Sequence, residues 1–255
     1  MSDKREREKR REEREAAEQQ VGTADRRQRL LQFGAGAVFL AIVVVVVLIV
    51  ANSGGSGGGD AENLEEKAEV NKLLSGIPQE GMVLGDPKAP VELIEFGDLQ
   101  CPFCKGFSEE VLPPIIEGMV KKGEAKIDFR NYTIIGPQSQ PAGAAALAAG
   151  EQGRGWTYVE LFYRNQGKEN SGYATDEFLE AVAEGAGVKD MARWNRERKK
   201  LVSEVEETSA EAQRLGFNGT PSFAVKSSKT SGIEAIGTPT SNPTRSLEES
   251  IENAS

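Results

Sequence analysis

Apolar positions along the chain follow two patterns, and each predicts a different kind of element. Residues 33–51 form one uninterrupted apolar run of 19 residues, with no charge and no strongly polar side chain. From residue 81 onward, two kinds of stretch follow one another. In short stretches apolar and polar residues alternate, as is typical of half-buried strands, and in others apolar residues recur at helical spacing. The segment SGGSGGG at residues 53–59 separates the two regions. The chain therefore divides into a polar N-terminal tail, an apolar segment, a flexible linker and one globular region.

The globular region is expected to contain strands and helices that alternate along the chain. Alternation predicts strands at residues 82–84, 91–96, 125–134, 221–226 and 232–236. Helical spacing and end signals predict helices at residues 62–74, 101–123, 142–152, 156–166, 176–184, 190–215 and 245–253. Thr175 and Asp190 are expected N-caps, and Gly216 is the expected C′ residue of the longest helix. Pro113 and Pro114 should bend or break the helix at 101–123.

The order of these elements indicates an α/β domain. Two strands, a helix and a strand are followed by several helices, then by two strands and a helix. This order resembles the thioredoxin fold with a helical subdomain, at about residues 138–216, inserted between its two βα halves. Residues 76–255 are assigned to this domain, and residues 52–75 to the Gly/Ser-rich linker with the leading helix.

The apolar run at residues 33–51 is long enough to cross a bilayer. As a helix it reaches about 28 Å at ~1.5 Å per residue, close to the ~30 Å hydrocarbon core. Its valines at 43–47 disfavour a helix in water, but in lipid no other single-pass conformation satisfies the backbone. A cleaved secretory signal is the alternative, yet its apolar core spans only ~7–15 residues after a short basic start. We therefore expect one uncleaved transmembrane helix, a signal-anchor.

The charges beside this run predict its orientation. Residues 1–32 form a charged tail, with ten Lys or Arg against eight Asp or Glu in the first 30 residues. Arg26, Arg27 and Arg29 flank the run on one side, and residues 52–59 carry no charge. The tail should therefore be cytoplasmic and the globular domain extracytoplasmic, on a single-pass protein of a bacterial cell membrane. We interpret the tail as a solvated segment; contact of its basic residues with anionic lipid is the alternative.

The net charge of the globular region restricts its partners. Residues 60–255 carry 21 basic and 32 acidic side chains, a net charge of −11. Such a surface argues against binding to nucleic acid and against close contact with an anionic membrane.

Two cysteines, three residues apart, are the clearest chemical signal. Cys101 and Cys104 are the only cysteines in the chain, and they follow a predicted strand at the start of a predicted helix. A disulfide between them closes too short a loop to stabilise the fold much. A zinc site needs four ligands, and the chain has no histidine and no third cysteine. We therefore interpret the pair as redox-active.

Their position suggests different roles for the two thiols. The start of a helix directs free backbone N–H groups and positive dipole at Cys101, which favours the attacking thiolate, so Cys101 is expected to be the exposed nucleophile. Cys104, one turn further in, can reach the same sulfur and resolve a mixed disulfide. Pro102 fits the first helical turn, where an N–H is not needed.

A family resemblance rests on these residues and on a second segment. IEFGDLQCPFC, followed about 115 residues later by Gly-Thr-Pro-Ser-Phe at 219–223, resembles the DsbA-like branch of the thioredoxin superfamily, which are exported disulfide oxidoreductases. The resemblance extends from about residue 81 to the C-terminus. It implies that Pro221 is a cis-proline facing the active-site disulfide and that Thr220 and Pro221 present backbone to an extended substrate. It also implies that Glu95 is a buried acid that accepts the proton of Cys104.

The strand position of Glu95 allows two orientations. Glu95 could lie on a solvent-facing side of its strand beside Glu92, but alternation places it with the apolar Val91 and Leu93, which favours burial.

Phe103 departs from the many strongly oxidising relatives that have histidine between the cysteines. Because Phe103 offers no charge or hydrogen bond, an extreme oxidant is not expected. With Pro102 and Thr220, it is a candidate substrate contact.

The expected function is that of an extracytoplasmic protein thiol-disulfide oxidoreductase that forms disulfides in exported proteins. The redox-active Cys101–Cys104 disulfide takes the place of a cofactor, and neither a cofactor nor a metal is expected. The resemblance implies reoxidation by a quinone-linked membrane oxidoreductase. The alternatives are a membrane-tethered reductase or isomerase, and a non-catalytic thioredoxin-fold domain that binds a partner.

Overall fold

The computed structural model describes residues 64–255. The expected tail at 1–32, the transmembrane helix at 33–51 and the linker up to residue 63 lie outside the described residues. Within residues 64–255, none of the helices has both the length and the apolar character that a membrane crossing requires.

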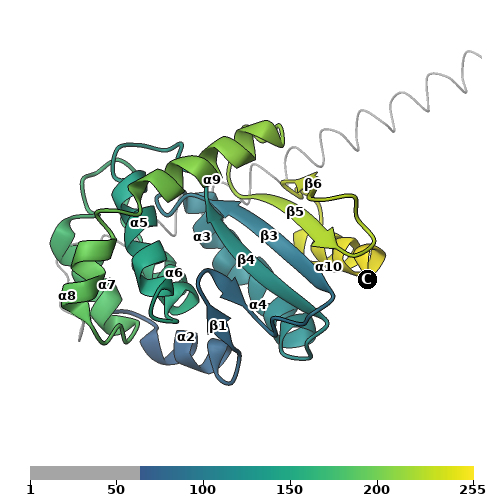
Figure 1. Cartoon of the computed structure of the whole chain (residues 1–255), viewed down its shortest axis with the longest axis horizontal. Helices are drawn as coiled ribbons and strands as arrows, with labels where there is room; N and C mark the ends of the chain where they lie inside the picture. Colours follow the sequence, from purple (N-terminus) through teal and green to yellow (C-terminus); the bar gives the residue numbers. More distant parts are fainter. Residues whose placement is uncertain (1–63) are drawn as a thin grey trace, which may run out of the picture. The chain divides into compact units, whose positions relative to one another are not determined.

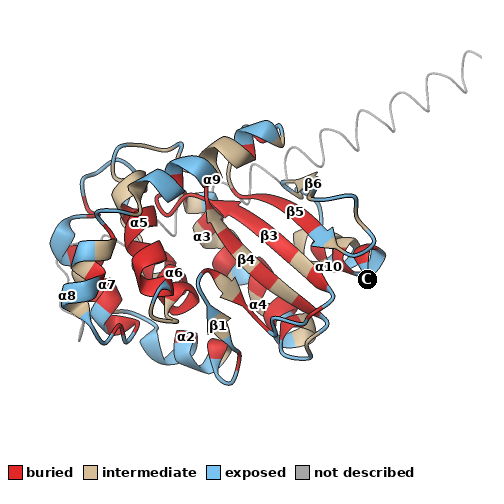
Figure 2. Ribbon diagram, in the orientation of Figure 1, coloured by how far each residue is buried: buried red, intermediate tan, exposed pale blue. Residues whose placement is uncertain are grey.

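A six-stranded mixed sheet forms the centre of the domain (Figure 1). Its order is β1-β2-β4-β3-β5-β6, in which β3 and β4 are parallel and the other neighbours are antiparallel. The strands are β1 (Gln79–Glu80), β2 (Val83–Leu84), β3 (Val91–Gly97), β4 (Ala125–Asn131), β5 (Ser222–Ser227) and β6 (Glu234–Gly237). Central strand β3 is buried along almost its whole length (Figure 2), as expected for a strand with neighbours on both edges and helices on both faces.

Helices cover both faces of this sheet. They are α2 (Lys67–Leu74), α3 (Pro102–Gly106), η1 (Phe107–Val111), α4 (Leu112–Ile115), η2 (Ile116–Val120), α5 (Ser139–Gly150), α6 (Gly155–Arg164), α7 (Asp176–Gly185), α8 (Met191–Glu197), α9 (Val202–Arg214) and α10 (Pro243–Ala254). Helices α5 to α9 occupy residues 139–214, the interval in which the sequence predicts an inserted helical block. The thioredoxin-like α/β fold is therefore confirmed for the described residues.

The two faces of β3 contribute to different apolar clusters. Val91 and Leu93 point into the larger cluster, which also contains both cysteines and the buried side of α10. Ile94 and Phe96 point into a smaller cluster on the opposite face, together with Ala212 of α9. The odd-numbered positions of β3 therefore face the cysteines.

The helical run after Cys101 continues through its two prolines. We expected Pro113 and Pro114 to bend or break it, but they occupy the first turn of α4, where a missing N–H is tolerated. Wide π-helical turns, η1 and η2, lie on either side of α4. Such turns relieve the clash between a proline ring and the preceding carbonyl groups, so the helical run does not break at the prolines.

The predicted helix at 190–215 is wrong as a single element. It begins at the Asp190 cap and ends before Gly216, which has φ +82°, but residues 198–201 interrupt it. Trp194 of α8 donates to the carbonyl of Ala145, whereas Thr208 of α9 donates to the carbonyl of Asn131 in β4. One straight helix cannot serve both partners, and no helix-breaking residue at 198–201 signals the turn.

The predicted strand at 125–134 is too long. Strand β4 ends at Asn131, because the backbone N–H groups of Ile134 and Ile135 leave the sheet and donate to the carboxylate of Asp98. The short strand β1 was not predicted, since two residues are too few to show alternation.

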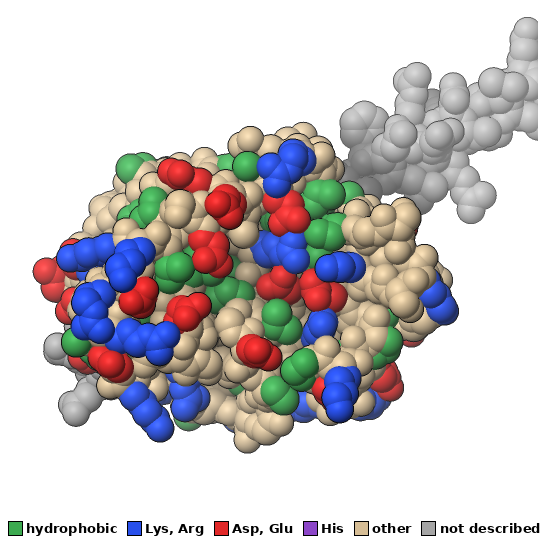
Figure 3. Space-filling model, viewed as in Figure 1, with side chains coloured by type: hydrophobic (Ala, Val, Ile, Leu, Met, Phe, Trp, Pro, Cys, Tyr) green, Lys and Arg blue, Asp and Glu red, His purple; other side chains and the backbone are tan. Residues whose placement is uncertain are grey.

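Charges of both signs are intermixed on the surface. Figure 3 shows Lys and Arg side chains interspersed with Asp and Glu over one face of the domain, without a large region of one sign. This face therefore offers no basic surface of the kind that binds nucleic acid.

Candidate active site

The two cysteines lie where β3 passes into α3. Cys101 has extended backbone (φ −77°, ψ 120°) and is the N-cap of α3, with Pro102 in the first turn. Cys101 is 3 % exposed, so its expected exposure is wrong, and Cys104, one turn further in, is completely buried; both thiols are free. The structure thus brings the pair to the helix start that the sequence predicted.

The two thiols differ in their environments. The pKa of Cys101 is lowered to about 7, chiefly by a hydrogen bond from the Cys104 thiol and further by the side chain of Thr220 and the backbone N–H groups of Phe103 and Cys104, against the opposing effect of burial. Burial raises the pKa of Cys104 well above its ordinary value, and its neighbour Cys101 adds to that rise. At neutral pH the pair therefore holds its negative charge on Cys101.

A second segment, between α9 and β5, faces Cys101. The Cys101 thiol lies 3.4 Å from the carbonyl oxygen of Thr220, to which it donates. The peptide bond between Thr220 and Pro221 is cis, and Pro221 is buried. Phe103, in contrast, is one of the two large apolar side chains that are exposed among the described residues, at 48 %.

Glu95 lies in the interior, on the face of β3 that carries Val91 and Leu93. It is 1 % exposed, and its register partners are Phe129 on β4 and Phe223 on β5. Its Oε1 atom has no hydrogen-bond partner within residues 64–255. Burial raises the pKa of Glu95 to about 8, and the charges of Glu160 and Cys101 add to that rise. The predicted burial of Glu95 is confirmed.

Asp98 fixes the loop that leads into Cys101. Its buried carboxylate accepts from the backbone N–H groups of Gln100 (2.9 Å), Ile134 (2.8 Å) and Ile135 (2.9 Å). Its carbonyl oxygen accepts from the N–H of Cys101 at 2.9 Å. Asp98 thus ties the loop before the cysteines to the loop after β4. The sequence does not predict this role of Asp98, because two of its three backbone partners lie 36 and 37 residues away.

The helical block holds the same loop from the other side. The Gln166 amide, just after α6, donates to the carbonyl of Leu99 (2.7 Å) and to that of Cys101 (3.1 Å). The Gln100 amide donates to the hydroxyl of Ser139, at the start of α5, at 2.9 Å. The cysteine loop is therefore fixed by both the sheet and the inserted helices.

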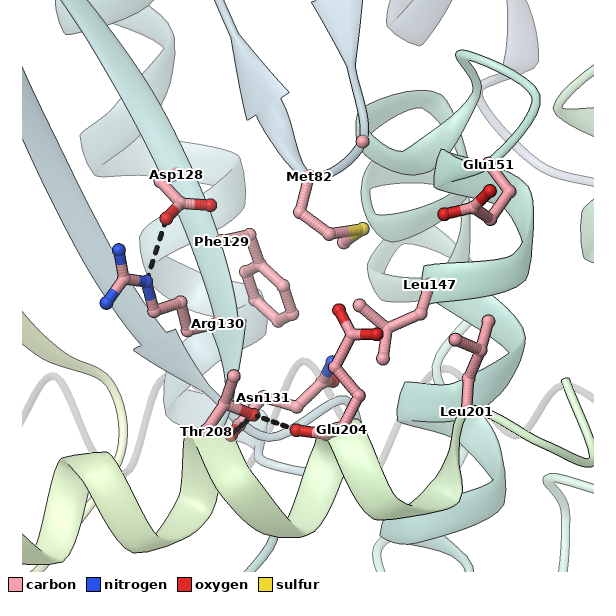
Figure 4. Close-up of a pocket in the computed structure, with 11 residues that line it drawn as sticks. Met82, Asp128, Phe129, Arg130, Asn131, Leu147, Glu151, Leu201, Glu204 and Thr208 are labelled. Carbon is pink, nitrogen blue, oxygen red and sulfur yellow. Dashed lines mark hydrogen bonds and ion pairs between the residues drawn. The ribbon is translucent and has the colours of Figure 1, made fainter.

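A cavity of about 210 Å³ lies elsewhere, between β4, α5 and α9 (Figure 4). Figure 4 shows β4 with Asp128 and Asn131 on one side, Glu151 at the end of α5 opposite, and Glu204 of α9 below. Burial raises the pKa of Glu204, and the charges of Glu151 and Glu207 add to that rise. None of the lining residues belongs to the cysteine site, so the redox chemistry does not use this cavity.

Comparisons with known proteins agree with this fold. A family model described as Thioredoxin matches residues 78–237. The probable disulfide bond formation protein D of Bacillus cereus is 30% identical over 166 residues, which cover 63% of this chain and 76% of that protein. The disulfide bond formation protein D of Bacillus subtilis is 30% identical over 164 residues, covering 61% of this chain and 72% of that protein.

Among solved structures, the chain is similar to oxidised BdbD from Bacillus subtilis. The TM-score is 0.59 at 26% identity, with 71% of this chain and 96% of that one covered. A thioredoxin-like sheet that carries a pair of thiols at a helix start defines a thiol-disulfide oxidoreductase. This chain belongs to the thioredoxin family, and it is a protein-disulfide oxidoreductase.

Proposed function

We propose that this protein forms disulfides in exported bacterial proteins, with Cys101 and Cys104 as its redox centre and residues 33–51 as its membrane anchor. The observation that carries the proposal is the division of labour between the thiols. Cys101 has a pKa lowered to about 7 and faces the Thr220 carbonyl, whereas Cys104 is buried with a raised pKa. The names of the two Bacillus relatives support the direction of the reaction.

The first step opens the disulfide of the oxidised protein. A substrate thiolate attacks the Cys101 sulfur, the bond between Cys101 and Cys104 breaks, and its electron pair leaves on Cys104. The product is a mixed disulfide between the substrate and Cys101. The lowered pKa of Cys101 makes it a good leaving group when a second thiolate attacks this mixed disulfide.

The second step releases the oxidised substrate. The second substrate thiolate attacks the substrate sulfur of the mixed disulfide, and Cys101 leaves as a thiolate. The substrate has then lost two electrons, which the Cys101–Cys104 pair has gained. No cofactor enters either step. A quinone-linked membrane oxidoreductase is proposed to take these two electrons and restore the disulfide.

Glu95 is proposed to carry the proton of Cys104. A thiolate at the buried Cys104 is costly, because burial raises its pKa. Glu95 shares the interior beneath the pair, and its pKa of about 8 lets it donate and accept near neutral pH. It would donate when the disulfide opens and accept when Cys104 attacks a mixed disulfide.

The substrate is proposed to lie across Pro102, Phe103, Thr220 and Pro221. Phe103 is exposed next to Cys101, and the Thr220 carbonyl already accepts from the Cys101 thiol. An extended peptide beside Thr220 would place its cysteine sulfur near Cys101. The exposed ring of Phe103 would favour apolar side chains next to that cysteine.

A glutathione equilibrium tests the direction of electron flow. The full chain is purified in detergent, equilibrated with known ratios of reduced and oxidised glutathione, and the fraction of thiols is measured. An oxidase of exported proteins should become reduced already at mildly reducing ratios, because its disulfide has a higher potential than the structural disulfides of secreted proteins. A potential as low as that of structural disulfides, below about −300 mV, would contradict the oxidase proposal and favour a reductase.

Cysteine labelling tests the membrane topology. Two variants are made in a background that lacks both native cysteines (Cys101→Ala, Cys104→Ala). Ser2→Cys introduces one thiol before residues 33–51, and Ser53→Cys introduces one thiol after them. A membrane-impermeant maleimide applied to intact cells should label the variant at position 53 and label the one at position 2 only after lysis. The reverse pattern, or equal labelling before lysis, would contradict an extracytoplasmic domain.

A further inference from the structure

Glu160 is a buried acid that the mechanism above does not use. It lies on α6, which packs against α3 and η1, and its side chain is completely inaccessible. Among residues 64–255 the other buried carboxyl groups are Glu95 and Asp98. Asp98 is occupied by three backbone N–H groups. A buried carboxyl costs free energy unless it is paired or protonated, so the position of Glu160 needs an explanation.

Glu160 is bonded to the helical run that carries the cysteines. The Ser108 hydroxyl donates to its Oε1 atom at 2.9 Å, and Ser108 is four residues, about one turn, after Cys104. Arg164 donates to its Oε2 atom at 3.4 Å. The same guanidinium bonds to the half-exposed Glu66 at 3.0 Å, so Arg164 links the buried carboxylate to the surface.

Several other charged groups face this cluster. On α6 itself, Tyr163 and Arg164 follow Glu160. Lys105 of α3 pairs with Glu109 of η1 at 3.6 Å, and the charge of Glu109 acts on Glu160. Glu66, just before α2, reaches the cluster through Arg164, and the charge of Glu160 acts on Glu95 of β3. Arg164 and Lys105 are the cations among these groups, and each is paired with a glutamate nearer the surface, Glu66 and Glu109.

The two buried carboxyl groups are unequal. Glu160 has two hydrogen-bond donors that stabilise its charged form, whereas the Oε1 atom of Glu95 has none. Two carboxylates that share one poorly hydrated interior cannot both ionise at low cost, so the better-solvated group ionises first. Burial raises the pKa of Glu160 to about 7, while the ion pair with Arg164 and the Ser108 bond oppose that rise. The pKa of Glu95, at about 8, is the higher of the two.

We infer that Glu160 is a positioning residue of the redox site, whose negative charge, held by Ser108 and Arg164, adds to the effect of burial in keeping Glu95 protonated near neutral pH. The inference rests on the proposed role of Glu95. When a substrate thiolate breaks the bond between Cys101 and Cys104, the electron pair leaves on Cys104. Glu95 then transfers its proton to that sulfur and becomes a carboxylate. Reoxidation returns the proton to Glu95 as Cys104 attacks. Without the charge on Glu160, Glu95 would lose its proton at lower pH and fewer molecules would be ready to donate.

Glu160→Gln in the full chain tests this inference. Glutamine keeps the shape and can still accept from Ser108, but it removes the charge. The measurement is the pH dependence of the rate at which a small thiol, dithiothreitol, reduces the Cys101–Cys104 disulfide. The midpoint assigned to Glu95 should move to lower pH, on the order of one unit. An unchanged midpoint would overturn the inference.

Two further variants separate the charge from packing. Glu160→Asp keeps a carboxylate and should leave the midpoint close to that of the parent protein. Glu109→Gln removes a half-buried carboxylate from the same cluster and is the matched control, for which no shift is expected. If Glu109→Gln shifts the midpoint as much as Glu160→Gln does, the effect is a general one and the inference fails.

The Glu95→Gln background distinguishes this inference from the proposed function. If Glu95→Gln alone leaves the pH profile unchanged, the proposed role of Glu95 is wrong. If Glu95→Gln alters the profile, adding Glu160→Gln should then produce no further shift of that midpoint. A further shift of equal size in this background would show that Glu160 acts on the cysteines directly and would contradict the inference.

One measurement needs no variant at position 160. Carbon-13 NMR of the reduced parent protein, labelled at the glutamate carboxyl carbons, should show two carboxyl groups that titrate near neutral pH instead of in the acid range. Their assignment follows from the loss of one signal in Glu95→Gln. If the remaining buried carboxyl titrates at higher pH than Glu95, Glu160 carries no charge while Glu95 is protonated, and the inference fails.

Discussion

The Cys101 thiol lies 3.4 Å from the carbonyl oxygen of Thr220, a residue 119 positions later in the chain. Two segments at opposite ends of the domain sequence therefore meet at one sulfur. Cys104, although only three residues from Cys101, is buried beneath it and has no such access to a substrate. The first prediction follows from this asymmetry.

Cys104→Ala should trap substrates, and Cys101→Ala should not. The first variant keeps the thiol with the lowered pKa and lacks the one that resolves a mixed disulfide, so covalent complexes accumulate. They are measured on non-reducing gels of cells that express the full chain. A double Cys101→Ala, Cys104→Ala variant provides the background. Equal amounts of complex in the two single variants would contradict the assignment of Cys101 as the attacking thiol.

Glu95→Gln should make the stability of the reduced protein less dependent on pH. The pKa of Glu95 is raised to about 8 in the folded state, from 4.5 for an ordinary glutamate. Between these values the folded protein keeps a proton that the unfolded chain has released, so the free energy of unfolding falls as pH rises. For one such group the slope is at most about 1.4 kcal/mol per pH unit.

Urea unfolding at pH 5, 6, 7 and 8 measures this slope. The variant should lose less stability than the parent protein over this range, and its relative gain should be greatest at pH 8. Glu110→Gln, a change of an exposed glutamate, is a suitable control and should leave the slope unchanged. A parent slope that Glu95→Gln does not reduce would mean that Glu95 ionises normally in the folded protein.

Phe103→His should lower the pKa of Cys101 and make the protein more oxidising. Phe103 contributes only its backbone N–H to the Cys101 thiolate, whereas an imidazolium at the same position adds a charge. Because a more stable thiolate favours the reduced form, the reduction potential should rise by tens of millivolts. Thiolate absorbance against pH and equilibration with glutathione measure the two effects. An unchanged or higher thiol pKa would show that this position does not control the site.

Asp98→Asn should destabilise the domain by about 2–4 kcal/mol, because one or more buried N–H groups lose their acceptor at ~1–3 kcal/mol each. The asparagine amide keeps one acceptor oxygen, so it cannot serve Gln100, Ile134 and Ile135 together. Urea unfolding of the full chain gives the change in stability. Asp86→Asn is the matched control, since Asp86 accepts from a single exposed N–H, that of Lys88, and a change within ~1 kcal/mol is expected. Equal losses of stability in the two variants would contradict the proposed role of Asp98 in holding the loop.

The elements and the cysteine pair could be predicted because their signals are local. Alternation in β3 was enough to place Glu95 on the buried face with Leu93, and Thr175 forms the predicted cap by accepting from the N–H of Phe178. The interruption at 198–201 could not be predicted, since its cause is the distance between the partners of α8 and α9. Packing overrides local helix propensity there.

The supporting residues of the site were missed for a related reason. Glu160, Asp98 and Gln166 stand in unremarkable sequence, and each acquires its role from a partner that the fold brings near. Gln166 lies 65 residues from Cys101, whose carbonyl it contacts. A polar residue just after a helix gives no sign that it will hold the backbone of a catalytic loop. Such residues become visible only when the inserted helices are placed against the sheet.

The anchoring of the cysteine loop by Asp98 and Gln166 also has a consequence for the proteins that this chain can act on. Both ends of the loop are held by hydrogen bonds that do not involve either sulfur, so the backbone around Cys101 has little freedom to move toward a partner. The approach must therefore come from the other molecule. Chains that are still unfolded, or cysteines on mobile loops, can reach the sulfur in an extended form, whereas a thiol inside a finished domain cannot. A protein with such a rigid site would oxidise its substrates early, before their folding buries the thiols.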